Sequence, residues 1–143
     1  MKKIWCLILT LLIVPTMSNS STKIDLQEYI NSFSWKKRIV LFITKAKYVH
    51  FINKTDDFFK VNSCENELRN LEYIRIVGDE VNNYNIPNRY MNKYGIWLIG
   101  YDGEDKSHST DISILKEIHN IIDTMPIRKM EMVRQNKKCT WGV

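Results

Sequence analysis

The strongest constraint on the fold is a run of five consecutive apolar residues, Ile39 to Ile43. Its β-branched side chains favour an extended strand. An apolar run without polar alternation is typical of a strand buried on both faces. Such a strand needs a cover of helices on either side of its sheet. The run therefore predicts a layered α/β fold.

The residues after this run predict helices and a second strand. Residues 45–70 contain neither Gly nor Pro, and their apolar residues recur every three to four positions, which predicts one or two helices. The polar stretch 53–56 is expected to end the first helix and cap the second. Residues 73–77 predict a second strand. The Asn-rich stretch 81–94 predicts a loop, with a short helix over 88–93.

The last third of the domain predicts a hairpin and a closing helix. Residues 95–100 form an apolar strand, and Asp102-Gly103 is a strong hairpin turn signal before a return strand over 106–109. A helix over 112–123 follows, and Met125-Pro126 ends it because proline cannot continue a helix.

The order of these elements predicts a thioredoxin-like α/β sandwich. We expect a central mixed sheet of about four strands, flanked by helices, with one or two further helical turns around Leu26–Ile30 before the first strand.

The first twenty residues are typical of a secretory signal peptide. Lys2 and Lys3 precede an apolar stretch over 4–14, and small polar residues follow. This stretch is shorter than the roughly 20 residues of a spanning helix. We therefore expect cleavage rather than an uncleaved anchor, and no stable membrane span afterwards. The expected divisions are a signal peptide (1–20), a thioredoxin-like domain (21–132) and a basic C-terminal tail (133–143), in a secreted or periplasmic protein.

The positive charge lies mainly at the C-terminal end. The chain has 21 Lys+Arg and 16 Asp+Glu, a net charge of +5, and removing Lys2 and Lys3 lowers this to +3. Residues 128–143 carry five basic side chains and one acidic one, so the rest of the exported chain is nearly neutral. With export, this disfavours nucleic acid as a partner. We expect the partner to be a protein or an envelope or matrix component, and the tail to end in a loose, solvated segment.

Two blocks of the sequence carry a family resemblance. The first is Leu26-x-x-Tyr29, followed by Trp35-Lys36-Lys37-Arg38-Ile39-Val40-Leu41-Phe42. The second joins the turn Leu98-Ile99-Gly100-Tyr101-Asp102-Gly103-Glu104-Asp105-Lys106 to the string Ile122-Asp123-Thr124-Met125-Pro126-Ile127-Arg128-Lys129-Met130-Glu131-Met132. Both resemble the domain of unknown function 4174, or P-DUDES group, which is also found at the C-terminus of sushi-repeat-containing proteins. The resemblance implies export, a thioredoxin-like fold and binding, without an established enzyme activity. Tyr101 departs from the family, which usually has Lys there.

Nine residues of these blocks form the candidate site. They are Trp35, Arg38, Asp102, Gly103, Asp123, Met125, Pro126, Arg128 and Glu131. One interpretation is an ion-pair and capping network that fastens the Met-Pro corner to the sheet. The other is a corner that binds an anion or a peptide. Loss of folding in Arg128→Ala would favour the first interpretation, and lost binding with intact folding would favour the second.

Thiol chemistry is the main alternative to a binding role. The stretch 44–48, where thioredoxins carry Cys-x-x-Cys, has no cysteine, and 93–95 lacks the proline that thioredoxins place there. Without the signal peptide, Cys64 and Cys139 remain. In an oxidising compartment they are expected either to bridge or to act as the reactive and resolving thiols of an atypical oxidoreductase or peroxidase.

No other catalytic motif stands out. His50, His108 and His119 are scattered, without the spacing of metal ligands. Hydrolase and phosphate-loop motifs are missing from the sequence. We therefore expect no metal, cofactor or catalytic residue. The sequence favours an exported, non-enzymatic binding or envelope-associated module, with the thiol oxidoreductase as the alternative.

Overall fold

The computed structural model describes residues 22–140 and contains a four-stranded mixed sheet. Its strand order is β3-β2-β5-β6, in which β2 is parallel to β3 and antiparallel to β5, and β5 is antiparallel to β6. The strands are β2 (Arg38–Thr44), β3 (Leu71–Val77), β5 (Gly95–Ile99) and β6 (Asp105–Ser109). The predicted signal peptide, residues 1–20, lies outside the described residues.

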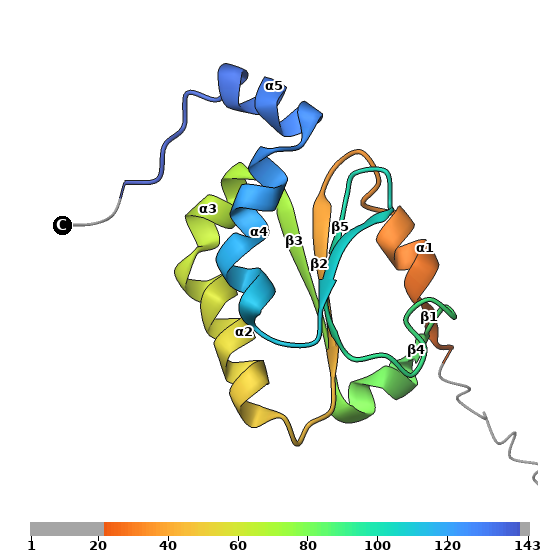
Figure 1. The fold of residues 1–143 in the computed structure, drawn as a ribbon. Helices are drawn as coiled ribbons and strands as arrows, with labels where there is room; N and C mark the ends of the chain where they lie inside the picture. The colour runs from red at the N-terminus through yellow and green to blue at the C-terminus, as the bar shows by residue number, and fades with distance from the viewer. Residues whose placement is uncertain (1–21, 141–143) are drawn as a thin grey trace, which may run out of the picture.

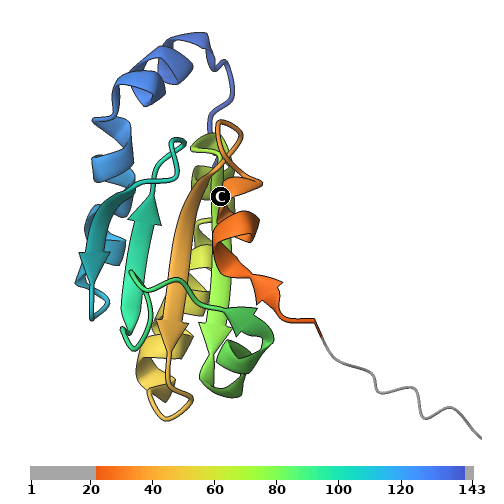
Figure 2. The same ribbon diagram turned by 90° about the vertical axis from the view of Figure 1, so that its right-hand side faces the viewer.

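Helices cover both faces of this sheet (Figure 1). One face carries α2 (Val49–Val61), α3 (Ser63–Leu68) and α4 (Ser113–Asp123). The other carries α1 (Leu26–Asn31), the 3₁₀ helix η1 (Gly78–Asn83) and a small parallel pair, β1 (Ile24–Asp25) with β4 (Tyr84–Asn85). The last helix, α5 (Pro126–Arg134), lies beyond one end of the sheet (Figure 2).

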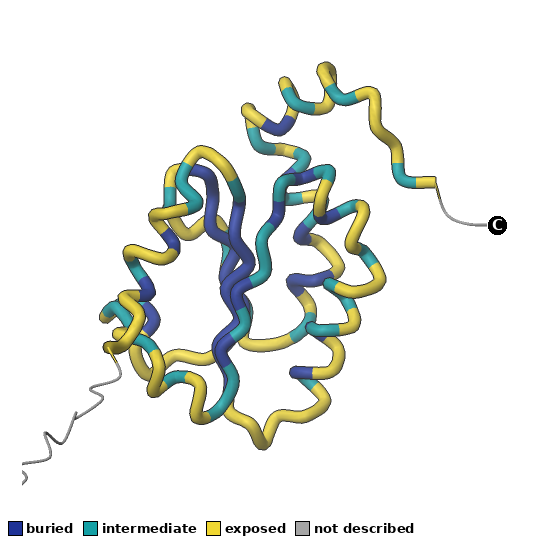
Figure 3. Tube along the Cα trace, turned by 180° about the vertical axis from the view of Figure 1, so that it is seen from behind, coloured by how far each residue is buried: buried dark blue, intermediate teal, exposed yellow. Residues whose placement is uncertain are grey.

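The central strand β2 divides the core into two halves. Every residue of β2 is buried (Figure 3). Ile39, Leu41 and Ile43 pack toward α1, while Val40 and Phe42 pack toward α2 and α4. The alternation follows from strand geometry, in which successive side chains point to opposite faces. Because both faces are covered, the side chains of this unbroken apolar run contribute to the hydrophobic layers on both sides of the sheet.

These features confirm the predicted thioredoxin-like α/β sandwich. The strands at 39–44, 73–77, 95–100 and 106–109 are present, and β3 begins two residues earlier, at Leu71. Within residues 22–140 no helix combines the length and the apolarity needed to cross a membrane.

The predicted break between two helices at 53–56 is wrong. Helix α2 runs through this stretch to Val61, and the change to α3 comes at Asn62. The hydroxyl of Thr55 donates to the carbonyl oxygen of Phe51, and Asp56 accepts hydrogen bonds from Tyr73 and Arg75 of β3. These polar side chains therefore satisfy contacts of a continuous helix instead of capping a new one.

The predicted short helix over 88–93 is also wrong. The chain makes turns there, and the short helix of this connection is η1, at the end of β3. Side-chain contacts hold this turn instead. Tyr90 is buried and its hydroxyl donates to Asp105, and the guanidinium of Arg89 lies over the Tyr90 ring.

The start of β5 provides a test of the hairpin. Gly95 has φ +145°, and a methyl group on it would overlap the carbonyl oxygen of Ser109 and the ring of His108. We expect Gly95→Ala to lower the free energy of unfolding by roughly 3 kcal/mol or more. Gly103→Ala is the control, since Gly103 shares a positive φ of +77° but has no atom closer than 3.8 Å to such a methyl group, and should lose about 1 kcal/mol. Urea denaturation measures both, and equal losses would contradict the packing argument.

Candidate functional site

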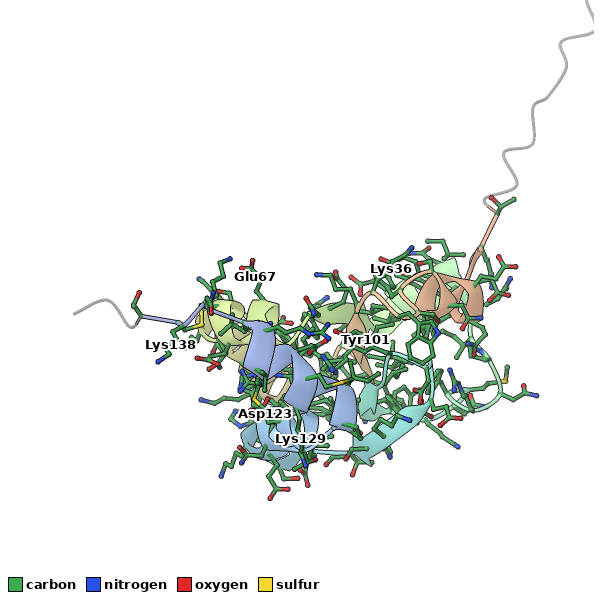
Figure 4. The ribbon with its side chains drawn as sticks, turned by 90° about the horizontal axis from the view of Figure 1, so that it is seen from above. Lys36, Glu67, Tyr101, Asp123, Lys129 and Lys138 are labelled. Atoms are coloured by element: carbon green, nitrogen blue, oxygen red, sulfur yellow. A yellow bond between two sulfur atoms is a disulfide. The ribbon has the colours of Figure 1, made fainter. Side chains whose placement is uncertain are left out.

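The candidate residues converge at the end of the sheet where β2 begins. Arg38 is the first residue of β2, Tyr101 follows β5, and Met125 and Pro126 join α4 to α5. Figure 4 looks down on this end of the molecule, with Tyr101 and Asp123 labelled. We call this region the corner. It consists of the start of β2 with Trp35 before it, the turn after β5, the C-terminal ends of α3 and α4, and the first turns of α5.

Arg38 is the most deeply buried charged residue of the corner, with 1% of its surface exposed. Its Nη1 donates to the carbonyl oxygen of Arg69 at 2.8 Å and to Oε2 of Glu131 at 3.1 Å. The guanidinium carbon lies 4.0 Å from the centre of the Tyr101 ring, a cation–π contact. The hydroxyl of Tyr101 donates to the other carboxylate oxygen of Glu131. Glu131 thus ties α5 to the start of β2 and to the end of β5.

Asp123 joins the three helices of the same corner. Both of its oxygens accept hydrogen bonds from Arg69, at 3.1 and 2.6 Å, and Oδ1 also accepts from Arg128 at 3.1 Å. Arg69 is the C-cap residue of α3, Asp123 is the last residue of α4, and Arg128 lies in α5. Arg128 also donates to the carbonyl oxygen of Leu68. A bidentate arginine–carboxylate pair of this kind is among the stronger side-chain contacts.

The ion pairs shift the pKa values of this cluster. Burial opposes ionisation of Asp123, but hydrogen bonds from Arg69 and Arg128 outweigh it and hold the pKa of Asp123 below its ordinary value. Burial likewise opposes the charge of Arg69, and its contacts with Asp123 and Glu65 raise the pKa of Arg69 nonetheless. Burial and the hydrogen bond to Glu131 raise the pKa of Tyr101. All three side chains therefore keep their ordinary charge states at neutral pH.

A pocket of about 150 Å³ opens beside this network. Arg38 and Tyr101 line it, and Met125, Pro126 and Ile127 form an apolar wall. Two nitrogens of Arg38, Nε and Nη2, have no hydrogen-bond partner among the described residues. The pocket thus combines an apolar wall with a buried cation whose donors are partly unused.

Trp35 flanks the pocket and is 70% exposed. Its backbone has φ +60°, and its N–H donates to the carbonyl oxygen of Tyr101 at 2.9 Å. A bulky side chain rarely adopts a positive φ. The bond to Tyr101 therefore helps to hold Trp35 in a conformation that keeps its ring in the solvent.

The opposite rim of the pocket is an ion pair on the hairpin. Nζ of Lys106 lies 2.6 Å from Oδ2 of Asp102, and Gly100 leaves the room that the Lys106 side chain occupies. Burial opposes the charge of Asp102, but the bond from Lys106 outweighs it and lowers the pKa of Asp102. Gly103 supplies the positive φ of the turn.

The structure divides the nine candidate residues into three groups. Five of them line the pocket: Trp35, Arg38, Asp102, Met125 and Pro126. Asp123, Arg128 and Glu131 form the ion-pair network, and Gly103 shapes the turn. The ion-pair network and the pocket are therefore neighbouring parts of one corner.

Sequence reasoning missed several residues of this corner. Arg69 lies outside both family-like blocks, so no signal marked it. Lys106 and Ile127 stand inside the blocks but were not selected. Tyr101 was noted only as a departure from the family pattern, although its ring and hydroxyl lie at the centre of the network.

A disulfide between Cys64 and Cys139 attaches the tail to α3, with 5.9 Å between their Cα atoms (Figure 4). Gln135 accepts a hydrogen bond from Arg128 and donates to the carbonyl oxygen of Leu68. The tail through Cys139 is therefore fastened to the fold, in contrast to the expected loose end. Part of the positive charge of residues 128–143 is neutralised as well, since Arg128 pairs with Asp123.

None of the three histidines lines the corner pocket, and they have separate roles. His50 is exposed, His108 stacks on Trp97, and His119 is within 2.7 Å of the Asn66 amide oxygen. Burial, with a contribution from Arg69, lowers the pKa of His119. Within residues 22–140 no group of three or more His, Cys, Asp or Glu is placed to hold a metal ion.

Comparison with known proteins identifies a family for this chain. The family described as Domain of unknown function (DUF4174) matches residues 29–131, well over half of the chain. The matched range includes all nine candidate residues, from Trp35 to Glu131. Neither a curated protein nor a solved structure matches the chain.

The lowered pKa of Asp123 predicts a pH-dependent contribution to stability. Because its folded pKa lies below the unfolded value, the contribution is complete above the unfolded pKa and is lost as pH falls through the folded pKa. Asp123→Asn should lower the free energy of unfolding at pH 7 by roughly 3 kcal/mol, since Arg69 and Arg128 lose their shared counter-ion. The deficit should shrink below about pH 4. Urea denaturation at pH 7 and pH 3 checks this, with the exposed Asp57→Asn as control; an equal deficit at both pH values would contradict it.

The disulfide predicts a thiol count and a loss of stability. In protein lacking residues 1–20, thiol titration under denaturing, non-reducing conditions should detect no free thiol. The Cys64→Ser/Cys139→Ser double variant should lose roughly 4 kcal/mol of unfolding free energy, because the bridge closes a long loop of the unfolded chain. Two free thiols would exclude the bridge.

Proposed function

The chain belongs to the DUF4174 family, and we propose that it is an exported binding protein that recognises a partner protein through the corner pocket, without catalysing a reaction. The basic start, short apolar stretch and small polar residues of 1–20 support export. The partner is then a protein of the envelope or of the extracellular matrix.

The exposure of Trp35 is the observation that carries this proposal. Tryptophan normally buries most of its large apolar surface, yet this side chain is 70% exposed and its backbone has φ +60°. Strained conformations of this kind concentrate at binding and active sites. Trp is also among the residues that contribute most to binding at protein interfaces.

The size of the pocket favours one inserted side chain over a whole small molecule. Its volume of about 150 Å³ is below the roughly 300–1,000 Å³ of sites that enclose small ligands. Met125, Pro126 and Ile127 supply an apolar wall for that side chain. We therefore propose that the partner inserts an apolar side chain between this wall and the ring of Trp35.

Arg38 adds a polar anchor to the same contact. Its Nε and Nη2 lack acceptors among the described residues, while Nη1 is held by Glu131 and by the Arg69 carbonyl oxygen. Both nitrogens are closed to solvent in this structure, so a main-chain carbonyl oxygen of the partner would satisfy these donors once the apolar wall moves aside. Because the network fixes the guanidinium in advance, little side-chain entropy is lost on binding.

A thiol oxidoreductase remains the second candidate, and the exposure of Cys64 favours it. Two features speak for a structural bridge instead. Glu65 and Glu67 of α3 pair with Arg69 and Lys137, and these pairs engage basic side chains that could otherwise stabilise a thiolate at Cys64. The bridge also fastens the tail that carries Gln135, a partner of Arg128 in the corner.

The binding proposal predicts the effect of Trp35→Ala. Affinity capture with the tagged protein, from the native envelope or medium, should recover a specific partner. Trp35→Ala should reduce its recovery at least about tenfold, because an anchor residue is lost. Stability in urea should change little, since the ring is mostly in the solvent. The control is Val133→Ala, which removes an apolar side chain that is 87% exposed and does not line the pocket.

Two outcomes separate the candidates. Capture that survives in the Cys64→Ser/Cys139→Ser double variant supports the binding proposal. Capture that is unchanged in Trp35→Ala, or that needs both cysteines and is reversed by reductant, contradicts it and favours thiol exchange.

A further inference from the structure

Strands β2 and β3 both end at the other end of the sheet (Figure 1). Two hollows with shared lining residues lie there. Their volumes are about 460 and 350 Å³, and Thr44 and Tyr94 line both. In layered α/β folds, ligands often bind outside the carboxyl ends of the strands. This place is separate from the corner, because Thr44 is the last residue of β2 and Arg38 is the first.

Thr44 is a buried polar residue without a partner. It is 1% exposed, and its hydroxyl forms no hydrogen bond with the described residues. A buried hydroxyl left in this state destabilises the folded protein. Thr44 lines both hollows. Its hydroxyl oxygen is closed to solvent in this structure, so it would donate to a bound group after the side chain turns toward the hollow.

Two lysines, Lys45 and Lys47, lie within three residues after Thr44 and line the larger hollow. The ammonium groups of Lys45 and Lys47 lie 4.9 and 5.1 Å from the ring centres of Tyr94 and Tyr48, and neither forms an ion pair among the described residues. Asp79 is an acidic residue on the same lining. The lining of the larger hollow therefore carries a net positive charge.

The N-terminus of α2 borders the smaller hollow. Tyr48, the residue before the helix, makes no side-chain cap, and both Tyr48 and Phe51 line the hollow. The N–H of Ile52 bonds to the Tyr48 carbonyl oxygen, so the three N–H groups before it lie ahead of the first intrahelical bond. Such a helix end favours anions.

The neighbouring loop holds this arrangement in place. Gly78 has φ +58°, and a Cβ atom on it would lie 3.0 Å from the Cβ of Ala46. The loop after β3 therefore packs tightly against Ala46 in the loop after β2. Ala46 stands between the two lysines, so this contact positions the backbone that carries them.

We propose that this end of the sheet binds a phosphate group, free or carried by a small molecule. A tetrahedral anion accepts hydrogen bonds from several directions at once, which suits the hydroxyl of Thr44, the ammonium groups of Lys45 and Lys47, and the first N–H groups of α2. The proposal is independent of the partner proposed for the corner.

Titration of the ¹⁵N-labelled protein with inorganic phosphate tests this site by NMR, against sodium chloride at equal ionic strength. We expect saturable shifts of the amide signals of Val49, His50 and Phe51. Thr44→Val, which keeps the shape of the side chain, should raise the Kd for phosphate about tenfold without lowering Tm. Lys45→Gln/Lys47→Gln should abolish saturable binding. Lys54→Gln/Lys60→Gln makes the same charge change on exposed positions of α2 and should leave the Kd unchanged.

Titration with glycerol 2-phosphate identifies the source of the phosphate group. Tighter binding than that of inorganic phosphate supports a phosphorylated small molecule, and equal or weaker binding supports free phosphate. The proposal is overturned if no saturable shift occurs, if acetate shifts the same amides with equal affinity, or if Thr44→Val binds phosphate as well as the parent protein does.

Discussion

The shared pairing of Asp123 with Arg69 and Arg128 is the interaction on which the rest of the corner depends. It joins the ends of α3 and α4 to α5 through one carboxylate. Helix α5 then carries Glu131 to Arg38 and Tyr101, which belong to the sheet. Removing the carboxylate would leave two buried arginines without their shared counter-ion. A buried charge that loses its partner strongly destabilises the folded state. The disulfide at Cys64 reinforces the same attachment from the tail side.

This network explains why an exposed tryptophan is found beside a rigid pocket. The carbonyl oxygen of Tyr101 accepts the N–H of Trp35, and the ring of Tyr101 stacks on Arg38. The same residues that connect α5 to the sheet therefore position the pocket and the aromatic ring next to it. If the corner has the binding role proposed above, this fixed arrangement reduces the side-chain entropy that is lost when a partner binds.

The sequence predicted the sheet well because burial on both faces leaves a direct mark, the unbroken apolar run of β2. The turn at Gly103 and the end of α4 before Pro126 were marked by residues with restricted or unusual backbone conformations. The helix break at 53–56 was predicted wrongly because Thr55 and Asp56 resemble caps but satisfy tertiary contacts. Arg69 carried no signal at all, since its carboxylate partner Asp123 is 54 residues away in the chain. The family resemblance located the corner, and only the geometry separated its ion pairs from its pocket.

Site-specific photo-crosslinking is the most direct test of the claim that the corner is a binding surface. A photoreactive phenylalanine analogue placed at position 35 should crosslink to one specific partner in the native envelope or medium. The crosslink should disappear when Arg38→Leu is introduced in a protein that still folds. The same analogue at Val133, an exposed position off the pocket, should not give this product. A product that is identical from both positions, or that persists without Arg38, would contradict the account.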